Sequence, residues 1–272
     1  MDNICAGIVT FNPDISRLKE NVSSIYKQVQ KLLICDNGSS NIVDIENGLA
    51  DYNIKYIRLS KNLGIAAALN EICKYAIKEG YGWVLTLDQD SVCPEHLISN
   101  MQLYVNQNDV AILAPEIVYR NNEDTFEKKK EEYDEVAWVI TSASLTNLSV
   151  WDKIGGFDEK LFIDMVDYDY CIRARRAGYR IIRLHTVTLM HELGNLHRKK
   201  VFGKTVNVTN HSAFRCYYMA RNNIILKRKL GVGKPVLENC KLIIKILVFE
   251  ANKGEKLKAV FKGIRDYKNY FD

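Results

Sequence analysis

Gly82-Trp83-Val84-Leu85-Thr86-Leu87-Asp88-Gln89-Asp90-Ser91 is an apolar run that ends abruptly in two carboxylates one residue apart. Trp83 to Leu87 has the aromatic and β-branched content of a buried strand and is too short for a helix. Its polar end is expected at the carboxyl edge of a sheet, where open α/β folds bind ligands. Asp88 and Asp90 are therefore expected to face a crevice.

The two carboxylates would point the same way on an extended backbone and repel one another unless a proton or cation lies between them. Hard oxygen ligands favour Mg²⁺ or Mn²⁺, which keep other coordination positions for water and phosphate oxygens. The plainer alternative for an isolated triplet is a solvated Asp-x-Asp turn. The segments that precede Asp88 along the chain decide between the two interpretations.

Apolar runs alternate with helix-like stretches through the first 90 residues. This alternation predicts a mostly parallel α/β sheet of the nucleotide-binding kind, with its loops opening on one edge. Further strands are expected at 110–115, 136–145 and 180–184, and a helix at 166–178. The four expected early strands are Ile4–Thr10, Lys31–Cys35, Ile54–Leu59 and Trp83–Asp90.

Composition is that of a globular protein of 272 residues with 47% hydrophobic residues, enough to bury a core. Seven cysteines, odd in number and without a C-x-x-C pair, favour reduced thiols over a disulfide framework or a zinc site. The start of the chain lacks a signal-peptide pattern, so a cytoplasmic location is expected. No nucleic-acid partner is expected. Three tryptophans are expected in the core: Trp83, Trp138 and Trp151.

The basic charge is concentrated at the end of the chain. From Arg221 onward there are 13 Lys/Arg against 5 Asp/Glu, a net +8, which leaves −3 of the overall +5 for residues 1–220. Apolar residues and lysines recur at helical spacing between Val236 and Ile264. We expect a catalytic domain over 1–226 and a basic amphipathic helical tail over 227–272 that lies on an anionic membrane surface. The alternative is packing on the domain or in a homodimer.

The familiar phosphate-binding loops are missing from the sequence. No G-x-G-x-x-G follows the first expected strand, and Gly233-Lys234 lacks the upstream glycine of a P-loop because Arg228 stands there. A nucleotide, if bound, is therefore expected to be held by side chains and a metal ion.

Five segments in order resemble the family 2 glycosyltransferases with the GT-A fold, and the last resembles their rhamnosyltransferase branch. The resemblance covers roughly residues 4 to 225. The segments are Val9-Thr10-Phe11-Asn12, Cys35-Asp36-Asn37-Gly38-Ser39, Asn62-Leu63-Gly64 through Asn70, Leu87-Asp88-Gln89-Asp90-Ser91, and Gly155 to Asp169.

The resemblance implies a nucleotide-sugar site made of loops that follow the strands. The loop at Thr10 and the side chain of Asp36 would hold the nucleobase and ribose, and Asn62 to Gly64 would close over the nucleoside. Asp88 would engage the ribose and, with Asp90, the metal. The implied nucleotide-sugar-binding residues are Thr10, Phe11, Asn12, Asp36, Asn62, Gly64, Asp88 and Arg221, and the implied metal ligands are Asp88, Asp90 and His191.

The catalytic base is expected in the segment Leu161 to Asp169. Asp167 matches the family's base position and would deprotonate the acceptor hydroxyl for attack at the anomeric carbon, with inversion. Asp164 is the second candidate. Val166 departs from the common family pattern, which has Glu there. Asp169 points about 200° from Asp167 on a helix and is expected to be structural.

The sequence signals at His191, at Arg221 and at a group of aromatic residues are less specific for one role. His191 follows a strand and would lie near the diphosphate or metal, although a lone histidine is often structural. Arg221 would suit a diphosphate or an acidic acceptor through its fork of donors. The aromatic residues Phe214, Tyr217 and Tyr218 could stack on sugars or pack in the core.

The sequence thus predicts an inverting glycosyltransferase. The expected donor is dTDP-rhamnose, with a UDP-sugar as the alternative, and the expected acceptor is a lipid-linked glycan of a cell-surface polysaccharide at the inner face of the cell membrane. A sugar-nucleotide nucleotidyltransferase would need a Gly-rich basic loop where Thr10-Phe11-Asn12-Pro13 stands. An inactive glycan-binding module is the alternative from a different class.

Overall fold

The computed structural model describes residues 3–119, 130–191, 197–201, 204–208 and 210–272. The chain forms two compact units. The first contains Met1–Glu159 and Tyr170–Glu192, and the second contains Lys160–Asp169 and Leu193–Asp272. The boundary expected between Leu226 and Lys227 lies inside a helix, α7 (Ala213–Leu230), so the structure divides the chain at different places.

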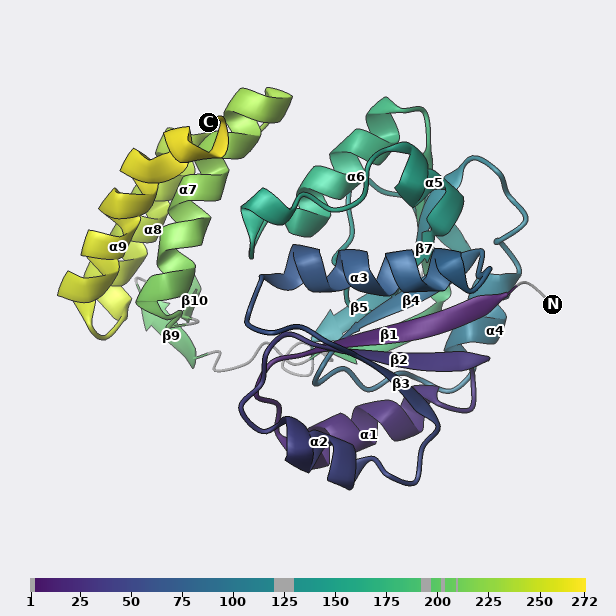
Figure 1. Ribbon diagram of the computed structural model, residues 1–272. Coiled ribbons are helices and arrows are strands. Elements are labelled where there is room, and N and C mark those ends of the chain that lie inside the picture. Colours follow the sequence, from purple (N-terminus) through teal and green to yellow (C-terminus); the bar gives the residue numbers. More distant parts are fainter. Residues whose placement is uncertain (1–2, 120–129, 192–196, 202–203, 209) are drawn as a thin grey trace. The chain divides into compact units, whose positions relative to one another are not determined.

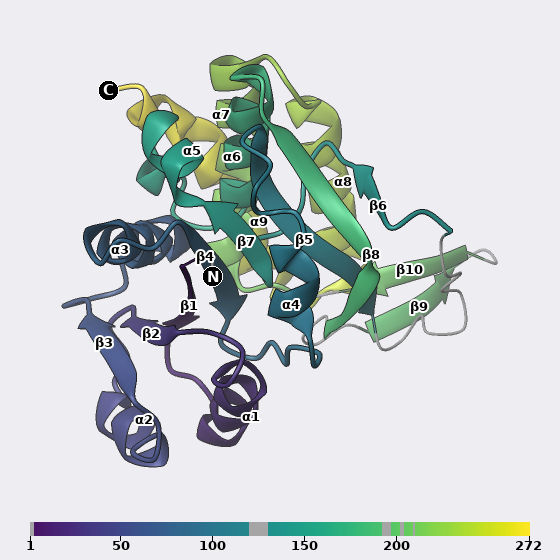
Figure 2. The same ribbon diagram turned by 90° about the vertical axis from the view of Figure 1, so that its right-hand side faces the viewer.

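An eight-stranded sheet forms the centre of the first unit, in the order β3-β2-β1-β4-β7-β5-β8-β6 (Figure 2). β1 pairs in parallel with β2 and β4, β2 with β3, and β5 with β8. β7 and β6 run antiparallel to their neighbours. The expectation of a mostly parallel α/β sheet is confirmed. The strands are β1 (Ile4–Thr10), β2 (Lys31–Asp36), β3 (Ile54–Arg58), β4 (Trp83–Asp88), β5 (Val110–Tyr119), β6 (Tyr133–Glu135), β7 (Ser144–Asn147) and β8 (Arg180–His191).

Helices cover both faces of the β3-β2-β1-β4 part of the sheet, with α3 on one face and α1 and α2 on the other (Figure 1). α1 begins after Asp14, whose side chain accepts a hydrogen bond from the amide of Arg17 and so satisfies a donor at the helix start. The helices of this unit are α1 (Ile15–Ile25), α2 (Ile42–Gly48), α3 (Ile65–Lys78), α4 (Leu97–Gln102), α5 (Leu148–Lys153) and α6 (Val166–Arg176), the last of which begins in the second unit.

β1 is buried along its whole length because both of its faces are covered. Ile4, Ala6 and Ile8 belong to a core cluster that also contains the buried apolar residues of α1. On the opposite face, a Cβ at Gly7 would lie 2.4 Å from Cγ2 of Ile72 in α3. A glycine therefore lets α3 approach the central strand closely.

Two expectations about the later strands and one about Trp138 need correction. Residues 136–143, expected as most of a strand, are irregular, and only Ser144–Asn147 pairs in the sheet. β8 extends from Arg180 to His191 as a single strand. Trp138 is 49% exposed, whereas Trp83 and Trp151 are each 6% exposed and lie in the core as expected.

The second unit contains an antiparallel hairpin of β9 (His197–Val201) and β10 (Lys204–Val208) and the helices α7, α8 (Pro235–Phe249) and α9 (Lys253–Asp266). Cys216 and Ala220 of α7 pack with Leu242 and Ile246 of α8 and with Val260 of α9. Within the described part of the chain, no helix is long and apolar enough to cross a membrane. All seven cysteines are free, and six of them are buried.

The loops at the carboxyl ends of β2 and β3 contact one another tightly at Gly38. This residue has φ +82°, and a Cβ there would lie 2.5 Å from the carbonyl carbon of Lys61. Gly80 has nearly the same φ, +80°, but a Cβ added there would meet nothing within 4 Å. The two glycines therefore share a left-handed backbone and differ in crowding.

We predict that Gly38→Ala lowers the free energy of unfolding by about 2–4 kcal/mol, because left-handed strain adds to displacement of a neighbouring backbone. Gly80→Ala, the matched control, should lose about 1 kcal/mol from strain alone. Denaturant unfolding of both variants measures the difference. Equal losses would show that the contact between the two loops contributes nothing.

Candidate functional site

The ends of three neighbouring strands bring the first group of predicted residues together. In the sheet register Thr10 of β1 lies opposite Asp36 of β2, and Val9 lies opposite Asp88 of β4. β2 and β4 lie on opposite sides of β1, so the chain reverses its direction of growth across the sheet there. Open α/β sheets bind ligands at such a switch point, outside the carboxyl ends of the strands.

Asp36 fixes the loop that follows β2. Its side chain is 2% exposed and accepts hydrogen bonds from the Thr10 hydroxyl (3.1 Å), the Gly38 amide (3.2 Å) and the Ser39 amide (2.9 Å). Burial, with smaller contributions from the carboxylates of Glu71 and Asp36, raises the pKa of the neighbouring Cys35 thiol to about 12. Asp36 therefore shapes the loop, and its predicted contact with the nucleobase or ribose stays a prediction.

Asn12 ties the β1 loop to the β2 loop. Its side-chain oxygen accepts hydrogen bonds from the backbone amide and the hydroxyl of Ser40. Its backbone amide donates to the Ser39 hydroxyl at 2.8 Å. The amide of Phe11 donates to the Gln89 side chain at 2.9 Å. This bond joins the β1 loop to the acidic loop after β4. The Phe11 side chain remains exposed beside these loops.

Asn37 ties the β2 loop to the loop before α3. Its side-chain oxygen accepts from the Leu63 amide at 2.8 Å, and its NH₂ group donates to the Asn62 side chain and to the Gly64 carbonyl. Asn62 in turn accepts from the Gly64 amide at 2.9 Å. The predicted residues Asn62 and Gly64 therefore belong to the same hydrogen-bonded frame as Asp36 and Asn12.

Asp88 and Asp90 lie at the mouth of this frame, with Asp88 partly buried and Asp90 exposed. The Asp88 carbonyl accepts from the Asn21 side chain at 2.6 Å and from the Ser91 amide at 3.3 Å, which closes a turn. In the part of the chain that the structure describes, no group of three or more His, Cys, Asp or Glu side chains surrounds a metal position. Carboxylate oxygens are ligands of the kind that Mg²⁺ or Mn²⁺ takes beside water and phosphate oxygens, and metal binding by Asp88 and Asp90 stays a prediction.

His191, the third predicted metal ligand, ends β8. Its side chain lies outside the described part of the structure. Its role as a ligand therefore stays a prediction.

The predicted base region, Lys160 to Asp169, belongs to the second unit. Phe162, Asp164 and Met165 all have positive φ values between 62° and 66°. Non-glycine residues in this conformation cost free energy and persist only where surrounding contacts hold them, often at functional sites. Asn222 of α7 supplies such contacts, because its buried NH₂ group lies 2.8–3.0 Å from the carbonyls of Leu161, Ile163 and Asp164.

The structure distinguishes the candidate aspartates in this segment. Asp164 is held by the Arg215 guanidinium, with N–O distances of 2.8–3.2 Å. Asp169 is fully buried and lies 2.6 Å from Nζ of Lys229, consistent with a structural role. Asp167 is in the first turn of α6, where one of its oxygens accepts from the Tyr168 amide at 2.8 Å. Asp164 thus has a strong structural partner, and the assignment of the base to Asp167 or Asp164 stays a prediction.

Arg221 lies on α7 and holds the same strained segment. Its guanidinium donates to the carbonyls of Lys160 and Leu161 and stacks on Tyr218, with its central carbon 4.6 Å from the ring centroid. Tyr218 also stacks on Phe162, with ring centroids 4.9 Å apart. The contacts of Arg221 support a structural role beside the predicted one, binding of the nucleotide sugar, which stays a prediction.

Several important residues were not recognised in the sequence. Polar side chains such as Asn21, Asn37 and Gln89 connect loops that are far apart in sequence, so their partners could not be predicted. Asn37 and Gln89 stand in sequence motifs, the turn Asp36-Asn37-Gly38 and the stretch Asp88-Gln89-Asp90, but these motifs do not identify the partners of the two side chains. Arg215 acts on Asp164, which lies 51 residues earlier.

Comparison with known proteins agrees with this geometry. A dTDP-rhamnosyl transferase from Shigella flexneri, RfbF, is 28% identical over 97% of this chain and 96% of its own length. A rhamnosyltransferase from Escherichia coli, WbbL, is 33% identical over 34% of each chain. The similarity to RfbF extends over nearly the whole of this chain.

Solved structures share the fold at low sequence identity. S. aureus TarS in complex with UDP-GlcNAc matches with a TM-score of 0.61 and 15% identity, over 99% of this chain and 82% of its own. A mannosyltransferase from Pyrobaculum calidifontis in complex with GDP-Man and Mn²⁺ matches with a TM-score of 0.60 and 13% identity, over 98% and 75%.

The family model for glycosyl transferase family 2 matches residues 5–177. This range includes every strand end that contributes to the frame around Asp36 and Asp88. The family expectation from the sequence is thereby confirmed, as is the GT-A-like α/β fold. This chain belongs to glycosyl transferase family 2, a family of enzymes that transfer sugars from nucleotide-sugar donors.

Proposed function

We propose that this protein transfers L-rhamnose from dTDP-rhamnose, with inversion, to a lipid-linked glycan of a cell-surface polysaccharide. The observation that supports this most strongly is the frame of side chains at the carboxyl ends of β1, β2 and β4, with Asp88 and Asp90 at its mouth. The choice of donor is supported by the name of the full-length relative, a dTDP-rhamnosyl transferase.

The donor would bind across the frame formed by the first three loops. The exposed Phe11 ring could pack on the base, and Asn62 and Gly64 would close over the nucleoside. Asp88 and Asp90 would hold an Mg²⁺ or Mn²⁺ ion, whose charge would neutralise the diphosphate leaving group. The loops are already joined by hydrogen bonds, so little ordering would be needed when the donor binds.

The acceptor hydroxyl needs a base as it attacks the anomeric carbon. We assign this role to Asp167, which would accept the hydroxyl proton and leave a product of inverted configuration. Asp164 would instead hold Arg215 and the strained turn that precedes α6. A nucleotidyltransferase or an inactive glycan-binding module would not need both a donor site and a base. Release of dTDP from dTDP-rhamnose in the presence of an acceptor distinguishes a glycosyltransferase from these two alternatives.

We predict that Asp90→Ala folds normally and loses metal-dependent donor binding, because the metal loses one of its two carboxylates. Thermal unfolding with dTDP-rhamnose and Mn²⁺ measures this, since a ligand at 100 times its Kd stabilises the native state by about 2.7 kcal/mol. Asp51→Ala, an exposed aspartate in the same unit, is the control. The same donor shift in Asp90→Ala, with and without EDTA, would rule out the metal role.

We predict that Asp167→Asn binds donor normally and transfers sugar about 10²–10⁴ times more slowly, because the amide cannot accept the proton. Asp164→Asn should instead reduce thermal stability by weakening the pair with Arg215 and should retain more activity. Single-turnover product formation measures the chemical step in both variants. An active Asp167→Asn beside an inactive but stable Asp164→Asn would reassign the base to Asp164.

We also propose that α8 binds an anionic membrane surface and so holds the enzyme beside its lipid-linked acceptor. Leu242 and Ile246 of α8 face the helical bundle. A second apolar face is exposed and consists of Val236, Leu237, Ile244, Leu247 and Val248. Lys241 borders this face, is exposed and pairs with Glu238 at 3.0 Å. An exposed lysine beside an apolar face suits a headgroup region that carries negative charge.

We predict that replacing both Ile244 and Val248 by Asn weakens binding to phosphatidylglycerol vesicles by more than about tenfold, since each apolar side chain contributes about 1.5–3 kcal/mol when buried. Because both side chains are exposed, the fold should survive. Leu103→Asn, an exposed apolar residue of the first unit, is the control. If the wild type sediments as a dimer and does not bind vesicles, and the double variant sediments as a monomer, this face is a subunit interface instead.

A further inference from the structure

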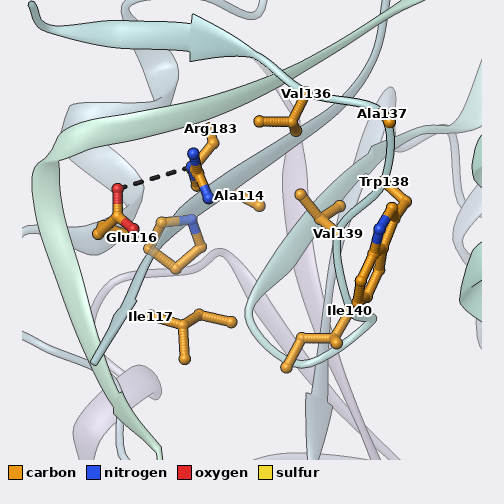
Figure 3. Close-up of a pocket in the computed structure, with 10 residues that line it drawn as sticks. Ala114, Glu116, Ile117, Val136, Ala137, Trp138, Val139, Ile140 and Arg183 are labelled. Atoms are coloured by element: carbon orange, nitrogen blue, oxygen red, sulfur yellow. Dashed lines mark ion pairs between the residues drawn. The ribbon is translucent and has the colours of Figure 1, made fainter. Parts of the chain in front are cut away.

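A cavity of about 390 Å³ lies in the first unit, between the carboxyl half of β5, the irregular residues 136–140 and β8 (Figure 3). Its volume is at the lower end of the range for small-molecule sites. None of its lining residues belongs to the frame around Asp36 or to the base segment. The residues that matter for its chemistry are Ala114, Glu116, Ile117, Trp138, Ile140 and Arg183.

The cavity lies along the half of β5 that is nearer the sheet edge of the acidic pair. Leu85 of β4 and Leu113 of β5 both lie opposite Leu145 of β7, which separates the two strands. Asp88 and Glu116 each follow three residues later on strands that run in the same direction. In the sheet order only β7 separates the strand of the cavity from the strand of the acidic pair. A sugar in the cavity would therefore lie beside the edge at which the acidic pair stands.

The wall of the cavity is joined to the acidic loop by hydrogen bonds. The Ser91 hydroxyl, one residue after Asp90, lies 2.6 Å from the Ser142 hydroxyl, and both side chains are buried. The Thr86 hydroxyl donates to the Thr141 carbonyl at 2.6 Å. These bonds fix the position of residues 136–140 relative to the donor site.

One side of the cavity is polar and held in place. The Glu116 carboxylate lies 2.5 Å from Nδ1 of His185 and 3.6 Å from Nε of Arg183. Arg183 also pairs with both oxygens of Asp134, at 2.8 and 3.1 Å, and this hydrogen bonding raises the pKa of its guanidinium. Glu116 and Arg183 therefore present a carboxylate and a guanidinium whose positions are fixed by ion pairs and hydrogen bonds.

The other side of the cavity is apolar and carries Trp138, which is half exposed although the other two tryptophans are buried. Figure 3 shows Trp138 and Ile140 on the side away from Glu116 and Arg183. A pyranose ring matches these two walls, because its C–H face can pack on an indole while its hydroxyl groups bond to a carboxylate and a guanidinium. An alkyl chain would leave the charged pair facing hydrocarbon, which is costly.

We infer that this Trp138 cavity is the acceptor subsite and binds a neutral pyranose unit of the acceptor glycan. The ring packs on Trp138, and its hydroxyl groups bond to Glu116 and Arg183. This inference rests on the proposed function and gives the acceptor a chemical class, an uncharged pyranoside. The acceptor hydroxyl then reaches the donor from the β5 side of the acidic pair.

Tryptophan fluorescence tests the cavity directly, because Trp138 is the one exposed tryptophan of the three. Methyl α-L-rhamnoside or methyl N-acetyl-α-D-glucosaminide at millimolar concentration should reduce acrylamide quenching at least twofold. Trp138→Phe should abolish that sugar-dependent change, and Leu103→Ala should retain it. Protection by farnesol but by neither glycoside would overturn the assignment in favour of a lipid chain. Protection by none of the three would also overturn it.

Kinetics give a second test that separates this inference from the proposed function. With a glycoside that accepts sugar from the active donor, Trp138→Ala should raise the KM for acceptor about tenfold, equivalent to about 1.4 kcal/mol. Glu116→Gln should also raise it, and the donor thermal shift should equal that of the wild type in both variants. An unchanged acceptor KM in an active enzyme overturns the subsite alone. No transfer from any donor, with glycoside protection of Trp138 intact, overturns the proposed function alone.

Discussion

The buried carboxylate of Asp36 is the interaction on which the geometry of the donor edge depends. It accepts one hydroxyl and two amide hydrogen bonds at the end of β2, and these three donors stabilise the charge of a residue that is only 2% exposed. The turn that it fixes contains Asn37 and Gly38, which contact the loop before α3. Removing that carboxylate would leave three donors unsatisfied and two neighbouring loops without a common support.

The proposed donor site and the segment with the proposed base are held by different kinds of contact. In the first unit, short polar side chains join loops at the ends of parallel strands, and within this frame Asn12 is the non-glycine residue with a positive φ, 46°. In the second unit, the segment before α6 has three left-handed non-glycine residues, held by Asn222, Arg215 and Arg221 of α7. Backbone strain of this kind is maintained by contacts elsewhere. The long α7 helix thus serves the positioning of the predicted base as well as the packing of the C-terminal bundle.

The cavity beside Trp138, which we propose as the acceptor subsite, is also held in place by contacts between distant segments. β5 continues past the point where β7 leaves the sheet, and the irregular residues 136–140 form a wall that a regular strand would have filled. Ser91 and Ser142 join that wall to the acidic loop. One sheet edge therefore carries the side chains proposed for the donor, the metal ion and the acceptor sugar.

The sequence by itself determined the α/β fold, the order of the first four strands and the identity of the residues at their carboxyl ends, because hydrophobic runs and turn residues are local signals. It also determined the family, since five motifs lie in register. Tertiary structure alone decided which polar side chains meet. Asn37 reaches Leu63, Arg215 reaches Asp164, and Ile246 rather than Ile244 faces the bundle. Trp138, expected in the core, lies at a cavity because residues 136–143 leave the sheet. Such outcomes depend on contacts between distant segments, which periodicity and composition do not encode.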